Sequence, residues 1–366
     1  MVQMLRHFGP NWFTVGMGTG ITALGAYLYP GAPGWLREAG TVLWLFNTLL
    51  VGLFLILIHL RMLLDRPGMK AILHDPVQSM FWGAMPMALT TVVNGFVDMG
   101  PGVFGPVAVQ VAFVVWVANV AMAVVAGIVV PYMMFIRQDH ALDRLTGIWL
   151  IPVVPAEVVA ASGSLLIPYV VGLEAQRTLL LISMGLWALS VPLAFLILGF
   201  LFLRLALHKL PPKEMAASTW ISLGTLGTGV MGLVGLGRYM PLVFGTLGQA
   251  MAGGSVLAAL MLWGFGLWWL AISILLTLHY LKRGMPFNLG WWGLTFPLGV
   301  FTGGTDFLYR QLGDWLLQDM ARGLFVMLAV FWLVVAVRTV VGLVRRCAWV
   351  TGGVPHAQRL AAGRAS

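Results

Sequence analysis

A single carboxylate stands inside a long apolar stretch of this chain. Glu157 follows Gly147 by about ten residues in a segment without other charge, so a helix would carry it roughly 15 Å inward, near the middle of a membrane. An ionisable side chain at that depth is a functional candidate. The alternative is a protonated or backbone-bonded glutamate that fills the space opened by Pro152 and Pro155.

A phenylalanine directly before a proline is the second candidate. Pro297 biases the backbone of Phe296 away from the α region, and the pair follows Thr295 in a segment flanked by glycines. A large ring held at such a kink could close a narrow apolar bore. With 20 phenylalanines in the chain, packing in the core or against lipid is the alternative.

Redox and metal chemistry have weaker support. His59 and His279 could hold haem in a membrane electron carrier, but no predicted span carries two histidines. The single cysteine, Cys347, rules out a disulfide framework and a cysteine-based metal site. We therefore expect no cofactor, no metal site and no enzyme activity.

Composition identifies the solvent of this protein as lipid. Hydrophobic residues make up 60% of the 366 positions and charged residues 9%, whereas soluble domains carry about 25% charged residues. The apolar runs are long enough for spanning helices and lack the alternation of barrel strands. The net charge of +9 is spread over loops, so no nucleic-acid partner is expected.

The apolar runs predict ten spanning helices. We place them near 12–30, 41–62, 79–97, 107–131, 147–171, 178–203, 217–237, 252–280, 287–305 and 321–344. With both termini cytoplasmic, 16 of the 21 Lys and Arg residues fall on the cytoplasmic side, as the positive-inside rule requires. The 16 tryptophans mostly fall near span ends, which is typical of interfacial belts.

The odd-numbered spans carry the helix breakers. Pro86, Pro152 and Pro297 recur at multiples of roughly 70 residues, which predicts five helical hairpins. Broken backbone survives in a membrane only against protein or a wet cavity, so the odd helices are predicted to line a central pore. Close packing of small residues without any pore is the alternative. The predicted pore-lining residues are Gly16, Thr19, Pro86, Thr90, Pro155, Glu157, Gly224, Thr228, Thr295 and Pro297.

An almost uncharged pore suits small anions. Helix N–H groups, threonine hydroxyls and the basic cytoplasmic rim would attract the anion. If Glu157 faces the pore, a carboxylate that can take up a proton would suit proton-coupled or pH-gated passage, because a fixed negative charge would repel the anion.

Several motifs resemble the tellurite-resistance/dicarboxylate transporter family. They are Phe8-Gly9-Pro10-Asn11-Trp12-Phe13 with Gly16-Met17-Gly18-Thr19-Gly20-Ile21, His74-Asp75-Pro76, Trp149-Leu150-Ile151-Pro152, Leu210-Pro211-Pro212, and Trp291-Trp292-Gly293-Leu294-Thr295-Phe296-Pro297-Leu298-Gly299. The family includes malate permeases, sulfite efflux pumps, tellurite-resistance proteins and plant slow anion channels. The resemblance spans nearly the whole chain.

Membership implies an all-α membrane protein with ten transmembrane helices, arranged as five hairpins with quasi-fivefold symmetry around a central pore. It also implies a homotrimer and maps the gating phenylalanine of the family to Phe296. It implies no role for a carboxylate at Glu157.

The sequence therefore predicts transport of small inorganic or carboxylate anions across a lipid bilayer, with malate ahead of sulfite. The alternatives are a haem or quinone redox protein and a helical bundle without transport. Residues 1–346 would form one transmembrane domain in a bacterial inner membrane. Residues 347–366 would form a short, basic, disordered cytoplasmic tail.

Overall fold

The computed structural model describes the backbone of residues 8–351 and the side chains of residues 8–345. Within these limits the regular structure is helical and contains no strand. The main helices are α2 (Phe13–Leu28), α3 (Gly34–Leu64), α5 (Ala84–Asp98), α7 (Val107–Ile136), α8 (Pro155–Leu166), α9 (Leu173–His208), α10 (Ile221–Gly237), α11 (Met240–Lys282), α12 (Thr295–Leu312) and α13 (Trp315–Thr351). Two shorter helices, α4 (Arg66–His74) and α6 (Gly100–Phe104), lie in connections.

One order of elements recurs five times along the chain. A 3₁₀ segment precedes a short helix, and a long helix follows it. The short helices α2, α5, α8, α10 and α12 begin at intervals of about 70 residues, which agrees with the period that the helix breakers predict. The 3₁₀ segments are η1 (Pro10–Trp12), η2 (Gln78–Gly83), η4 (Gly147–Leu150), η6 (Lys213–Trp220) and η7 (Leu289–Leu294). Two more, η3 (Leu142–Arg144) and η5 (Ile167–Tyr169), lie outside this pattern.

The five short helices pack against one another in sequence order. α2 contacts α5, α5 contacts α8, α8 contacts α10, α10 contacts α12, and α12 returns to α2. Their 3₁₀ segments also meet, η1 with η2, η2 with η4, η4 with η6, and η6 with η7. The starts of all five short helices therefore gather at one end of the molecule.

Glycine makes these contacts possible. A Cβ atom at Gly227 of α10 would lie 2.5 Å from the backbone nitrogen of Phe301 in α12, and one at Gly83 would collide with the carbonyl oxygen of Ile151. A Cβ atom at Gly18 of α2 would collide with the hydroxyl of Thr295. Small residues at such points let helix backbones approach closely. The close-packing interpretation of the glycines therefore holds at these contacts.

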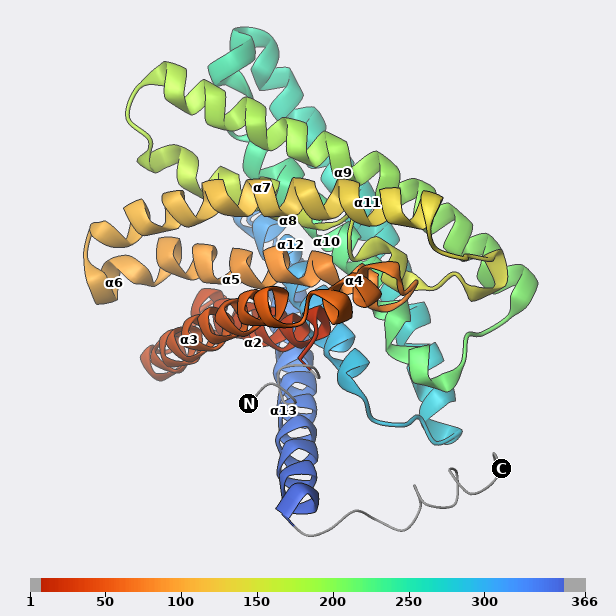
Figure 1. Cartoon of the computed structure of the whole chain (residues 1–366). Coiled ribbons are helices and arrows are strands. Elements are labelled where there is room, and N and C mark those ends of the chain that lie inside the picture. Colours follow the sequence, from red (N-terminus) through yellow and green to blue (C-terminus); the bar gives the residue numbers. More distant parts are fainter. Residues whose placement is uncertain (1–7, 352–366) are drawn as a thin grey trace, which may run out of the picture.

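The long helices surround the short ones. In the most apolar stretches of α3, α7, α11 and α13 only 28% of residues are buried, and in α9 33%, against 78% for residues 78–98 and 83% for residues 213–237. In Figure 1 the long helices point outward in different directions, from α7 and α9 in the upper half to α13 below. Exposed apolar surface of this extent requires lipid as its solvent.

Each long helix carries a tryptophan that forms a hydrogen bond with the short helix of the next repeat, and the last long helix, α13, bonds in this way to α2. The indole N–H group donates to a backbone or hydroxyl oxygen of that short helix. The bonds run from Trp44 to the carbonyl of Val92 (3.2 Å), from Trp116 to the carbonyl of Val159 (2.9 Å), from Trp187 to the carbonyl of Gly229 (3.4 Å), from Trp263 to the hydroxyl of Thr305 (3.1 Å) and from Trp332 to the hydroxyl of Thr19 (3.2 Å).

These five tryptophans, 69 to 76 residues apart in the chain, do not form an interfacial belt. Their last member links α13 to α2 and so joins the fifth repeat to the first. Trp220 and Trp292, which fall near the ends of predicted spans, are also buried, and they donate to the hydroxyls of Thr277 and Thr339.

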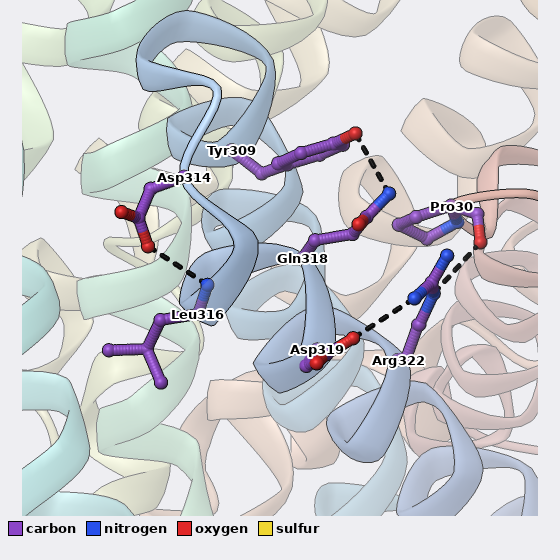
Figure 2. A network of polar contacts seen from close by, with 7 residues as sticks. All are labelled: Pro30, Tyr309, Asp314, Leu316, Gln318, Asp319 and Arg322. Atoms are coloured by element: carbon purple, nitrogen blue, oxygen red, sulfur yellow. Dashed lines mark hydrogen bonds and ion pairs between the residues drawn. The ribbon is translucent and has the colours of Figure 1, made fainter.

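A polar network beyond the C-terminal end of α2 also links the fifth repeat to the first. Figure 2 shows Arg322 of α13 donating to the carbonyl of Pro30 and to Asp319, at 3.1 and 3.0 Å. Gln318 donates to the hydroxyl of Tyr309 across the turn between α12 and α13. The loop after α2 is thereby held against the last helix pair.

The structure confirms an all-helical membrane protein. Seven helical segments in the described part of the chain are long and apolar enough to cross a membrane. The runs at 12–30, 147–171 and 287–305 are not among them; α2 and α8 have 16 and 12 residues and, at about 1.5 Å per residue, fall short of the bilayer core. α12 continues to Leu312, beyond the predicted end at 305. α13 runs to Thr351, and residues 352–366 of the predicted tail lie outside the described residues.

We expect Gly227→Ala to lower the free energy of unfolding by about 1–3 kcal/mol, because the added methyl group meets backbone that cannot rotate away. Thermal unfolding in detergent measures the effect. Gly264→Ala in α11, where a Cβ atom meets nothing within 4 Å, is the matched control and should leave the melting temperature unchanged or raise it. Equal melting temperatures for the two variants would contradict the proposed role of Gly227.

Candidate functional site

Two cavities lie at opposite ends of the five short helices. The Phe296 cavity, of about 250 Å³, is lined by residues near the helix starts, among them Met17, Met87, Val154, Gly224 and Phe296. The second, of about 290 Å³, is lined by residues near the helix ends and is named here the Arg310 cavity. All five short helices contribute to the wall of the Arg310 cavity, and four of them to that of the Phe296 cavity; for α8 it is Val154, the residue directly before the helix, that lines the latter.

The Phe296 cavity is mainly apolar. Its one charged lining residue is Glu214, and the amides of Asn11, Gln78 and Asn288 also line it. The Phe296 ring is 3% exposed and belongs to the same buried cluster as Met17. The ring is thus held by packing at the inner limit of the cavity.

The Arg310 cavity carries balanced charge. Asp98, Arg238, Asp306 and Arg310 line it. Arg310 donates through Nε to Asp306 Oδ2 at 2.6 Å and through Nη2 to the carbonyl of Leu28 at 3.2 Å. Asp306 Oδ1 has no hydrogen-bond partner within the described part of the chain. A small anion entering this cavity would meet two guanidinium groups, each already engaged.

A buried layer separates the two cavities, which share no lining residue. On α8 the face that begins at Val154 in the Phe296 cavity reaches Ser164 in the Arg310 cavity through steps of three and four residues, by way of Glu157 and Ala161. Residues at that spacing lie on one helix face. Glu157 is fully buried, so it belongs to the layer between the cavities.

The neighbouring helices follow the same register. On α10, Thr228 lies between Gly224 of the Phe296 cavity and Met231 of the Arg310 cavity. On α12, Val300 lies between Phe296 and Gly303. We call the layer of Glu157, Thr228 and Val300 the septum; each side chain is at most 3% exposed.

Glu157 and Thr228 contact each other across the septum. Thr228 Oγ1 lies 2.7 Å from Glu157 Oε1, 2.8 Å from the carbonyl oxygen of Gly224 and 3.3 Å from that of Thr225. Glu157 Oε2 has no hydrogen-bond partner among the described residues. Two residues chosen separately from the sequence therefore form one pair.

The other predicted residues divide between cavity walls and helix contacts. Gly224, Phe296 and Pro297 line the Phe296 cavity. The six that line neither cavity are Gly16, Thr19, Pro86, Thr90, Pro155 and Thr295.

Specific contacts explain where several of these six lie. A Cβ atom at Gly16 would meet the side chain of Val51 at 2.7 Å, and Thr19 accepts the indole N–H of Trp332. Asn119 of α7 donates to both the Pro86 carbonyl and the Thr90 hydroxyl, at 3.0 and 2.9 Å. These groups face the long helices.

Pro155 and Thr295, the remaining two of the six, have structural roles in their own helices. Pro155 occupies the first position of α8, where proline costs no intrahelical hydrogen bond. Thr295 bonds to the carbonyl of Trp292 at 2.7 Å and packs against Gly18.

Some of the N–H groups expected to attract an anion are already used. The Asp75 side chain accepts from the backbone N–H groups of Val77 and Gln78 at the start of η2, and the Asn288 side chain accepts from that of Gly290 in η7. Side chains of the protein itself thus already bind N–H groups at the start of two of the five 3₁₀ segments, η2 and η7.

Sequence reasoning missed the charges of the Arg310 cavity. It ended the ninth span at 305 and so placed Asp306 and Arg310 in a loop. The signal was present, because the two residues have i,i+4 spacing and Gly313 follows as a left-handed helix cap.

His59 and His279 make separate local contacts. His59 bonds to the carbonyl of Leu55 within α3, and the ring of His279 packs edge-on against Tyr280. Within the described residues no group of three His, Cys, Asp or Glu side chains could hold a metal ion.

The fold and the two cavities define a class of protein, a multi-pass membrane protein with hollows at both ends of its inner helices. Residues 7–340 match the SLAC1 family, described as voltage-dependent anion channel. The chain belongs to this family of anion transporters, which confirms the resemblance that the sequence motifs indicated.

Relatives align over most of their length. A protein of Trichophyton rubrum named as a sulfite efflux pump is 32% identical over 92% of this chain and 91% of its own. An uncharacterized transporter of Methanocaldococcus jannaschii is 28% identical over 92% and 94%. The protein of Saccharomyces cerevisiae named as a sulfite efflux pump is 22% identical over 86% and 82%.

The Asp306–Arg310 pair should matter for stability. The Asp306 side chain is 9% exposed, so Arg310→Gln leaves a buried carboxylate without its cation and should lower the free energy of unfolding by about 1–3 kcal/mol. Adding Asp306→Asn should recover most of that loss in thermal unfolding. Asp319→Asn, at an exposed ion pair, is the control and should change stability by about 0.5 kcal/mol or less. A double variant no more stable than Arg310→Gln would contradict the pairing.

Proposed function

We propose that this protein carries sulfite across the membrane along the axis that joins the Phe296 and Arg310 cavities. The observation that carries the proposal is the pair of cavities at opposite ends of the same five helices, separated only by the septum. Membership in an anion-channel family supports it. A protein that only packed helices would need no hollow at either end.

We infer that all ten predicted helices span the membrane, in five hairpins with quasi-fivefold symmetry. The five recurrences of short and long helix support this arrangement, as do the contacts of α12 with α2 that return the fifth repeat to the first. A short helix spans together with its 3₁₀ segment, and the surrounding long helices exclude lipid from the irregular backbone.

Sulfite is favoured over malate as the transported anion. The malate preference came from motifs alone, whereas several relatives that align over most of this chain carry the name sulfite efflux pump.

Phe296 is proposed as the gate. Its ring lies at the inner limit of the Phe296 cavity and is buried against apolar residues of other short helices. Rotation of this ring would open the cavity toward the septum, while an anion facing the closed ring would have to give up its hydration without polar replacement.

The distribution of Lys and Arg supports cytoplasmic termini and, for a bacterial protein, an inner-membrane location. The Phe296 cavity would then open to the cytoplasm, because it lies at the helix starts. Residues 1–346 would form one domain, residues 347–366 a basic cytoplasmic tail, and the family resemblance suggests a homotrimer.

Sulfite flux from liposomes that contain the purified protein tests the proposal. We expect release that is saturable or conductive and depends on the protein, with nitrate, chloride and malate run in parallel to rank selectivity. No movement of any of these anions would reject transport. Malate flux with sulfite excluded would reject the choice of substrate alone.

Phe296→Ala should raise anion conductance several-fold, because removal of the ring widens the passage at its narrow apolar point. Conductance in planar bilayers measures the change. Phe200→Ala removes a ring that is 47% exposed on α9, away from both cavities, and should leave conductance as in the unmodified protein. An unchanged current in a folded Phe296→Ala protein would remove this residue from the gate.

A further inference from the structure

The two short contacts of the Thr228 hydroxyl can both be hydrogen bonds only if an additional proton is present. A threonine hydroxyl has one hydrogen to donate, yet Oγ1 lies within hydrogen-bond distance of two acceptor atoms, the Gly224 carbonyl oxygen at 2.8 Å and Glu157 Oε1 at 2.7 Å. Carbonyl oxygens only accept. If Thr228 donates to Gly224, as a helical threonine commonly does, the contact with Glu157 forms only when Glu157 is the donor.

The opposite assignment leaves a poorly satisfied ion. An ionised Glu157 would accept one hydrogen bond from Thr228, its Oε2 atom would have none within the described chain, and the Gly224 carbonyl would lose a partner. Burial of a charge without a counter-charge is costly. Hydrogen-bond counting therefore favours a neutral carboxylic acid that donates to Thr228.

The surroundings supply no compensating cation. α5, α7, α9, α10 and η5 pack against α8. α10 carries no titratable side chain, and those of the other elements lie close to helix ends. They are Asp98 of α5, Tyr132 of α7, Tyr169 of η5, and Glu174, Arg177, Arg204 and His208 of α9. On α12, Asp306 and Arg310 lie on the wall of the Arg310 cavity. Among the described residues, Thr228 is the one side chain that bonds to Glu157.

We propose that Glu157 is a proton-binding site in the septum and that an anion crosses only while this carboxyl group carries its proton. The inference rests on the proposed function and adds to it the residue that makes transport depend on pH. Loss of the proton, to water in either cavity, leaves a negative charge on the face that connects the cavities. The protonated form presents no charge, and its O–H can turn from Thr228 to the passing anion.

The test compares sulfite flux for the unmodified protein and Glu157→Gln in liposomes with equal pH on both sides. Glutamine keeps the shape and an N–H donor toward Thr228 but stays neutral. Because sulfite itself titrates, the quantity compared at each pH is the flux of the unmodified protein divided by the flux of Glu157→Gln, in which the titration of the substrate cancels. We expect this ratio to fall by about tenfold or more from mildly acidic to mildly alkaline pH.

A ratio that stays constant while both proteins transport would overturn the inference and leave the proposed function intact. No flux from the unmodified protein at any pH would instead overturn the proposed function. The two failures are therefore distinguishable.

Infrared spectroscopy gives a readout that does not need transport. The unmodified protein should show the carbonyl band of a protonated carboxylic acid that Glu157→Gln lacks. Should that variant fail to fold, Thr228→Val supplies the comparison, because loss of the hydrogen-bond acceptor should shift the same band. A spectrum with no such band at mildly acidic pH would overturn the inference.

Discussion

The hydrogen bonds from the five tryptophans to the following short helices are the interaction on which the rest of this structure depends. A short helix begins in 3₁₀ geometry and contains glycine, so it is poorly suited to stand alone in lipid. Each indole N–H fixes such a helix from outside at a carbonyl or hydroxyl that hydrocarbon could not satisfy. The bond from Trp332 to Thr19 joins the end of the chain to its beginning, so the inner helices are enclosed on all sides.

Glycine serves the other half of this arrangement. At Gly227 the missing side chain lets the backbones of two neighbouring short helices touch, and at Gly83 it lets η2 touch the backbone just before α8. Gly224 and Gly303 instead border the cavities. Close packing and a central passage, which looked like competing interpretations of one composition, are therefore compatible. Tight contact between neighbouring short helices separates the two cavities, which lie at the two ends of the group they form.

Electrostatics differs between the cavities and the septum. In the Arg310 cavity the carboxylates and guanidinium groups can pair with each other and with carbonyl oxygens. In the septum Glu157 has, among the described residues, only the hydroxyl of Thr228 for a partner. On the described elements that pack against α8, the cationic side chains lie close to helix ends. The septum is therefore the part of the proposed passage where one proton would change the electrostatics most.

The sequence by itself determined the solvent, the helical class, the five-part period and the family, because apolar length, proline spacing and motifs are properties of consecutive residues. It also selected Phe296, Glu157 and Thr228. Only the tertiary structure decided that the last two form a pair, that Thr19 and Thr90 turn toward the long helices, and that Asp306 and Arg310 belong to a cavity wall. Which face of a helix points inward depends on its neighbours, and on inner helices that are apolar all round the sequence gives no preferred face. The tryptophan spacing was visible in the chain, but its meaning required knowing which helix each indole reaches.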